Sequence, residues 1–195
     1  FSPEGARGAS LGVDAHLAAA CGAAGRRSNL GVEALIMLNA THLLSICEGG
    51  AGAALSQVRV FDLGGGGGRG GGGGGASATL VRSGTYSICR GLSPVDVARA
   101  PGGGLLVLER GYDPEQGNTI RLAHLSRAQL HDSWEQPLTP HEVALLEPGT
   151  HLTDNMEGLA TSFEEDGSEA RVFLVSDDND NSFQQTLLYE FVWNV

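Results

Sequence analysis

Acidic side chains stand at both ends of several short apolar segments of this 195-residue chain, and they are the residues best suited to chemistry. Three of them precede an apolar segment and are almost evenly spaced along the chain: Glu33, Asp96 and Glu157. Three more follow the apolar segment that comes next: Glu48, Glu109 and Asp177. Carboxylates that a fold brings close together must share a proton, pair with a cationic side chain or bind a cation.

Calcium is the cation that best suits such a set, because it prefers oxygen ligands from Asp, Glu and Asn. If the strand ends meet, we expect a Ca²⁺ site formed by Glu33, Glu109, Glu157, Asp177, Asp178 and Asn179. Such an ion would hold a phosphate against an acidic surface and activate water. The alternative is that each acid caps a turn or accepts a hydrogen bond from a backbone N–H at a strand end.

The expected catalytic residues are Glu157, Asp177 and Arg110. Arg110 directly follows an apolar segment and could grip a substrate oxyanion, although it could equally neutralise Glu109 or Glu157. A serine nucleophile has less support, because no Gly-x-Ser-x-Gly sequence occurs and the six His show no metal-ligand spacing.

Composition narrows the classes of partner. The net charge of −11 argues against nucleic acid, and it requires a cation as intermediary if the substrate is a polyanion. No apolar run approaches the roughly 20 residues of a membrane span. Three Cys allow one disulfide and a free thiol, or three thiols. The Asn39-Ala40-Thr41 triplet is a glycosylation acceptor sequence, which fits a secreted protein but arises easily by chance.

Short β-type segments separated by turn residues dominate the chain, so we predict an all-β fold. The expected strands cover 35–38, 42–47, 57–63, 78–82, 85–89, 104–110, 119–125, 170–176 and 186–193. Two segments, 125–131 and 139–146, have helical features, and for them helix and strand or irregular structure remain alternatives.

Three segments repeat one plan of acid, strand, turn, strand and acid: 29–49, 94–111 and 154–179. Hairpins that recur at such a period are typical of the blades of a β-propeller. Because a ring typically needs four to eight blades, we expect an incomplete, propeller-like fold. The glycine tract within 64–76 predicts a disordered loop between two strands, and residues 1–27 read as a poorly structured extension before a domain over 28–195.

The order of these motifs resembles the phytase-like family, described as having esterase-like activity of phytase. The resemblance runs from about Asn29 to Phe191, and its most specific segments are DNMEGLA (154–160) and SDDN (176–179) followed by Gln185 and Thr186. It implies a propeller-like all-β fold, usually in exported proteins, and hydrolysis of phosphate monoesters or other esters. It supplies no catalytic residue.

The chain also departs from the family pattern. Ala34 follows Glu33 where the family favours Gly, and Asp180 stands where it tends to an aromatic residue. The amino-terminal part of the family pattern has no counterpart, so we expect a fragment. Two functions follow: a hydrolase of small-molecule esters or phosphoesters whose acids hold a divalent cation, or a non-catalytic propeller segment that serves as a binding or scaffold module.

Overall fold

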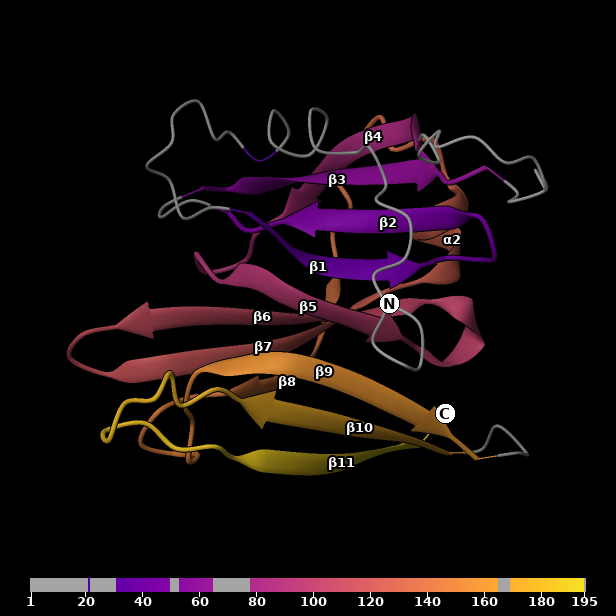
Figure 1. Cartoon of the computed structure of the whole chain (residues 1–195). Helices are drawn as coiled ribbons and strands as arrows, with labels where there is room; N and C mark the ends of the chain where they lie inside the picture. The colour runs from indigo at the N-terminus through magenta and orange to yellow at the C-terminus, as the bar shows by residue number, and fades with distance from the viewer. Residues whose placement is uncertain (1–20, 22–30, 50–52, 65–77, 165–168, 195) are drawn as a thin grey trace, which may run out of the picture.

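The computed structural model describes residues 21, 31–49, 53–64, 78–164 and 169–194, which form three antiparallel sheets (Figure 1). The first sheet contains β1 (Val32–Met37), β2 (His42–Cys47), β3 (Leu55–Asp62) and β4 (Thr79–Ser87). The second contains β5 (Ser93–Arg99), β6 (Leu105–Asp113), β7 (Gly117–Leu125) and β8 (His141–Leu146). The third contains β9 (Met156–Phe163), β10 (Glu169–Ser176) and β11 (Leu188–Asn194). The predicted all-β fold is confirmed in part: the described residues are mostly β and form three antiparallel sheets, with one short α-helix.

Of the two segments for which helix and strand were both possible, 125–131 contains a helix and 139–146 contains a strand. The short helix α2 (Arg127–His131) begins at Ser126, whose hydroxyl accepts a hydrogen bond from the Gln129 backbone N–H in a capping box. Residues 141–146 form β8 instead, because pairing with β7 supplies the hydrogen bonds that a single helical turn would otherwise make. A 3₁₀ turn, η1 (Pro101–Gly103), joins β5 to β6.

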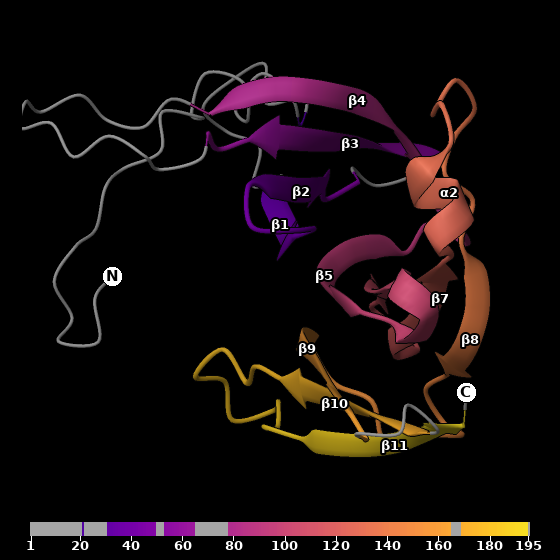
Figure 2. The same ribbon diagram turned by 90° about the vertical axis from the view of Figure 1, so that its right-hand side faces the viewer.

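The three sheets follow one another in sequence order, and their first strands lie side by side (Figures 1 and 2). Two cores lie between the sheets, and β6 serves both of them because its side chains alternate. Leu105 and Val107 pack toward the first sheet, whereas Leu106 and Leu108 pack toward the third. The second sheet is therefore buried on both faces, as its nearly continuous apolar sequence requires.

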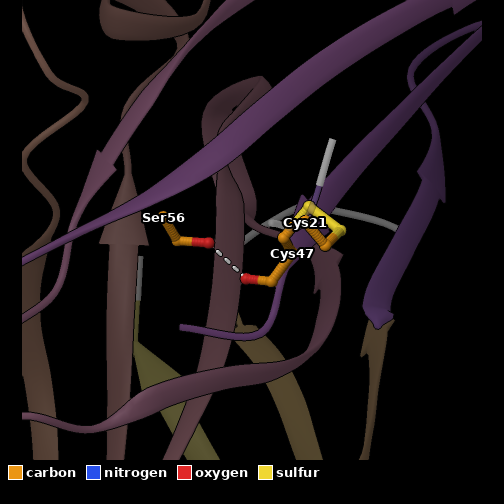
Figure 3. Close-up of a disulfide and its surroundings, with 3 residues drawn as sticks. All are labelled: Cys21, Cys47 and Ser56. Atoms are coloured by element: carbon orange, nitrogen blue, oxygen red, sulfur yellow. Dashed lines mark hydrogen bonds between the residues drawn. A yellow bond between two sulfur atoms is a disulfide. The ribbon is translucent and has the colours of Figure 1, made fainter. Parts of the chain in front are cut away.

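A disulfide bond joins Cys21 to Cys47 at the end of β2, with the two Cα atoms 5.4 Å apart (Figure 3). The Ser56 hydroxyl donates a hydrogen bond to the carbonyl oxygen of Cys47, so the bonded residue is held from β3 as well. Cys89 is a free thiol. The remaining residues of 1–27 and the glycine tract at 65–77 lie outside the described residues, so the predictions made for them stay predictions.

Replacing Cys21 with serine should lower the free energy of unfolding by about 3 kcal/mol, because the bond closes a loop with a sequence separation of 26 residues. Urea unfolding monitored by circular dichroism will measure the loss, and a reducing agent should destabilise the unmutated protein similarly. The matched control is Cys89→Ser, which removes a thiol outside the bond. An equal loss in both variants would contradict the assignment.

Candidate functional site

A β-bulge occurs at the same place in all three sheets, near the start of the first strand. The extra residue is Glu33 in β1, Val95 in β5 and Glu157 in β9, because pairing skips from 32 to 34, from 94 to 96 and from 156 to 158. In the sequence, Val95 lies midway between Glu33 and Glu157. A bulge redirects side chains and is common beside active sites. The chain therefore repeats one structural unit at a constant interval, and its bulge carries Glu in two of three copies.

The partner strands give a second equivalent position. Cys47, Glu109 and Ser176 pair with the residues just before the three bulges, and all three are buried. The residues that follow them are partly buried or exposed: Glu48, Arg110 and Asp177. Arg110, rather than Glu109, is thus the counterpart of Glu48 and Asp177. The repeat identified from sequence was one residue out of register in the second unit.

Glu109 does not join the other predicted site residues. It is fully buried, accepts a hydrogen bond of 2.6 Å from the Tyr86 hydroxyl, and forms a 2.6 Å ion pair with Arg121. Arg121 also contacts Glu142 at 3.1 Å. Burial raises the pKa of Glu109, although Tyr86 and Arg121 oppose that rise. Glu109 therefore belongs to the packing between the first and second sheets and not to a metal site.

Glu33, Glu48, Arg110 and Glu157 face one another at the same end of the sheets. Nη1 of Arg110 lies 3.4 Å from Oε1 of Glu157, and the Asn155 amide donates to that oxygen at 2.8 Å. Burial raises the pKa of both Glu33 and Glu48; the charge of Glu157 raises both further, and the charge of Arg110 lowers both. The fold thus brings together three predicted residues, Glu33, Arg110 and Glu157, with Glu48.

Asp96 connects two sheets. Its carboxylate accepts a 2.8 Å hydrogen bond from the Val97 backbone N–H and a 2.6 Å hydrogen bond from that of Leu159. Burial raises its pKa, and these two hydrogen bonds lower it. Because Leu159 belongs to β9, the side chain fastens the second sheet to the third.

The acidic turn after β10 is held mainly by its own side chains. Asp177 accepts from the backbone N–H of Asn179 at 3.0 Å, and Asp178 accepts from that of Asp180 at 3.0 Å and from the Thr186 hydroxyl at 3.0 Å. Asn179 donates to the Gln184 side chain at 3.2 Å and has a φ of 49°, which Asn tolerates well. These are the local bonds that Asp and Asn favour in turns.

The six predicted metal ligands are not gathered into one site. Within the described ranges, no group of three His, Cys, Asp or Glu side chains is placed to hold a metal ion. Glu109 lies between two sheets, and Asp178 and Asn179 close the turn. The calcium ion therefore stays a prediction.

A pocket of about 830 Å³ opens at this end of the sheets. Glu48 and Arg110 lie in its wall, together with residues 148–149 and 151–155 before β9 and the residues Asn181, Phe183 and Gln184 before β11. The wall also contains polar residues that sequence reasoning did not select: Ser93, Asn118, His151, Asp154 and Asn155. Two exposed aromatic side chains, Tyr112 and Phe183, line it as well.

Asp154 and Asn155, the first two residues of the segment 154–160, line this pocket, and each polar side chain of the segment's DNME part has a hydrogen-bond partner or an ion pair. Asp154 accepts a 2.8 Å hydrogen bond from the Gln185 backbone N–H, which fixes the loop before β11. Asn155 is buried and orients Glu157. Gly158 leaves room for the neighbouring strand, since a Cβ atom there would lie 2.5 Å from Cγ1 of Val175. Asn155 could have been found from the sequence, because it stands inside the DNMEGLA motif.

Comparison with known proteins identifies a family. No curated protein matches the chain. Within the described ranges, no helix has the length and apolar character needed to cross a membrane. The model of the phytase-like family, described as esterase-like activity of phytase, matches residues 1–180, which include most of the pocket wall and the segment before residue 28. The chain therefore belongs to the phytase-like family.

Proposed function

We propose that this chain hydrolyses ester bonds, with phosphate monoesters or carboxyl esters of small molecules as substrates and the 830 Å³ pocket as their site. The observation that carries the proposal is Arg110, a half-buried guanidinium in the pocket wall of a chain from the phytase-like family. A guanidinium binds phosphate and other oxyanions in a bidentate manner. Arg110 supplies the positive charge that the net charge of −11 otherwise denies to an anionic substrate.

Two carboxyl groups beside Arg110, those of Glu48 and Glu157, are suited to donate and accept protons. Glu48 lines the pocket and has a raised pKa, so it keeps its proton to a higher pH than an exposed carboxyl group does. A protonated carboxyl group can protonate the leaving alkoxide of an ester. Glu157, held by Arg110 and Asn155, is suited to accept a proton from the attacking water. Asp177, the equivalent of Glu48 in the third sheet, would help to position that water from the turn.

Replacing Glu48 with glutamine should lower kcat/KM by about 10²-fold, which is the usual contribution of a general acid. The unmutated protein should lose activity as the pH rises through the raised pKa of Glu48, because the carboxyl group then gives up its proton. The glutamine variant should lack this alkaline decline. Glu147→Gln, which alters an exposed carboxyl group 3.9 Å from Nη1 of Arg90, is the matched control. An unchanged alkaline decline in the Glu48 variant would assign the acid to another residue.

The substrate class is tested by assaying a phosphate monoester and a carboxyl ester that release the same coloured phenol. We expect turnover of at least one of them, and loss of that turnover in Glu157→Gln with an unchanged unfolding midpoint. If neither is hydrolysed and the variant changes only stability, the chain is a non-catalytic binding or scaffold module. The bonds that close the acidic turn internally favour this second function.

The calcium hypothesis has a separate test. A thermal unfolding experiment in added Ca²⁺ and then in excess chelator would show an upward and a reversible downward shift of the midpoint if the ion binds the folded state. The same two conditions belong in the ester assays. Equal midpoints would remove calcium from the proposal without affecting the roles of Arg110 and Glu48.

We further infer that the three sheets are blades of an incomplete propeller in an exported protein. Three observations support the propeller: each sheet is a meander, the first strands of the sheets are neighbours, and the bulges recur at a constant interval. The disulfide between Cys21 and Cys47 supports export, because such bonds persist in oxidising compartments.

A further inference from the structure

We propose that Asn39 is an N-glycosylation site, with a lipid-diphosphate-linked oligosaccharide as the glycan donor. The sequence Asn39-Ala40-Thr41 meets the requirement for an acceptor, with a residue other than Pro in the middle. Such triplets are common, so the sequence alone decides nothing. The structure adds three independent observations: the place of the triplet in the fold, the conformation of its side chains and a disulfide elsewhere in the same sheet.

The triplet forms the turn between β1 and β2. Asn39 and Ala40 are exposed, and the turn closes with a 2.7 Å hydrogen bond from the Leu38 backbone N–H to the His42 carbonyl oxygen. Arg99 of β5 supports the turn from beneath by donating to the carbonyl oxygens of Met37 and Leu38 at 2.8 and 3.0 Å. The acceptor is thus presented on a fixed, solvent-exposed hairpin.

The side chain of Asn39 leaves its reactive atom accessible. Oδ1 accepts hydrogen bonds from the backbone N–H groups of Thr41 and His42, both at 2.9 Å, and lies 3.3 Å from the Thr41 hydroxyl. In the part of the chain that the structure describes, Nδ2 of Asn39 makes no hydrogen bond. Hydrogen bonds to the amide oxygen hold the side chain, and the nitrogen that would receive the glycan stays open.

The glycan donor supplies both the oligosaccharide that is transferred to Asn39 and the diphosphate that leaves. A bond forms between Nδ2 of Asn39 and the anomeric carbon of the oligosaccharide, while the bond from that carbon to the diphosphate oxygen breaks. The lipid diphosphate leaves with the electron pair, and the nitrogen loses one proton to the solvent. The reaction takes place in the compartment where disulfides form, and the Cys21–Cys47 bond indicates that the chain passes through such a compartment.

A glycan at this position would not obstruct the pocket. The β1–β2 turn lies at the opposite end of the sheets from the β6–β7 turn and the loop between β10 and β11 (Figure 1). Glu33 lies near the start of β1 and Asn39 follows the end of that strand six positions later, which corresponds to roughly 20 Å at about 3.3 Å per extended residue. The modification is therefore compatible with the proposed function and does not depend on it.

The test is to secrete the full chain from a eukaryotic host and to treat the purified protein with a peptide-N-glycosidase in heavy-oxygen water. We expect Asn39 to be converted to a labelled aspartate, seen in the peptide mass spectrum. Asn39→Gln and Thr41→Val should abolish the label, whereas Thr41→Ser, which keeps the hydroxyl, should retain it. The ester assay should give the same kcat/KM for the modified protein and for Thr41→Val.

Secreted, disulfide-bonded protein with an unlabelled Asn39 would overturn the proposal. Label at Asn39 that persists in Thr41→Val would overturn it as well, because the labelled aspartate would then come from deamidation without a glycan. Since both outcomes are read from peptide masses, they are distinct from a failure of the hydrolase proposal, which would leave the label in place.

Discussion

Replacing Arg121 with methionine is expected to lower the free energy of unfolding by about 3–5 kcal/mol, the largest loss we predict for a single substitution. The reason is the carboxylate that remains behind. Glu109 is fully buried, and without its 2.6 Å ion pair it would keep only the Tyr86 hydroxyl as a partner. A buried charge that loses its counter-ion either bears its full desolvation cost or takes up a proton. Urea unfolding of the variant at neutral pH measures the loss.

The double variant Glu109→Leu with Arg121→Met separates this explanation from a simple loss of packing. Because it removes both charges, it should recover most of the stability lost in the single variant. Arg171→Met is the control on the surface: its guanidinium lies 2.5 Å from Glu190 but is exposed, so its removal should change stability far less. A double variant no more stable than Arg121→Met would contradict the argument.

Replacing Arg110 with methionine is expected to reduce kcat/KM for the preferred ester by about 10²–10³-fold, the cost of removing one group that stabilises a developing oxyanion. The unfolding midpoint should change little, because the Glu157 partner is accessible to water. Steady-state kinetics with the two phenol-releasing esters measure the effect. The loss should fall mainly in kcat if the charge acts in the transition state, and in KM if it only binds substrate.

Two comparisons make this result specific. Arg110→Lys keeps the charge but not the fork of donors, so it should restore only part of the activity. Arg90→Met removes a more exposed arginine, whose Nη1 lies 3.9 Å from Oε1 of Glu147, and should leave kcat/KM unchanged. Full activity in Arg110→Met would show that the guanidinium serves only to neutralise Glu157 and would remove it from the proposed mechanism.

Much of the fold could be predicted from the sequence, because the alternation of apolar and polar residues is a local property. The sequence also predicts the repeat, but its second unit lies one residue away from the position at which the structure repeats. The spacing of acids aligns Asp96 with Glu33 and Glu157, but the residue in the bulge of the second sheet is Val95. The same spacing aligns Glu109 with Glu48 and Asp177, but Glu109 is the buried residue and Arg110 is the one that follows it. An alignment of acids cannot detect a bulge, since the residue inserted in that copy is apolar. A shift of one residue exchanges the two faces of a strand.

The remaining differences have a tertiary origin. Glu48 was noticed in the repeat but not assigned to the site, because nothing in its sequence neighbours predicts that Arg110 and Glu157 approach it. Asp178 and Asn179 were assigned to a metal, whereas Thr186 and Gln184 satisfy them within the loop. Segment 139–146 carries a helix-start pattern, but β7 offers it a strand partner. In each case the role of the residue or segment depends on a contact that is distant in sequence or on a competing local hydrogen bond.

The meander order of the sheets bears on how the chain is made. Every strand in a sheet pairs with one that precedes or follows it in sequence, so each sheet can form as soon as its own segment leaves the ribosome. A nascent chain that ends after β8 would have two sheets but would still expose Leu106 and Leu108, which the third sheet later covers. Synthesis that pauses between β8 and β9 would then leave an apolar sheet face uncovered. That face stays uncovered until β9 and β10, which supply Met156, Leu159, Val172 and Leu174, have been made and have paired.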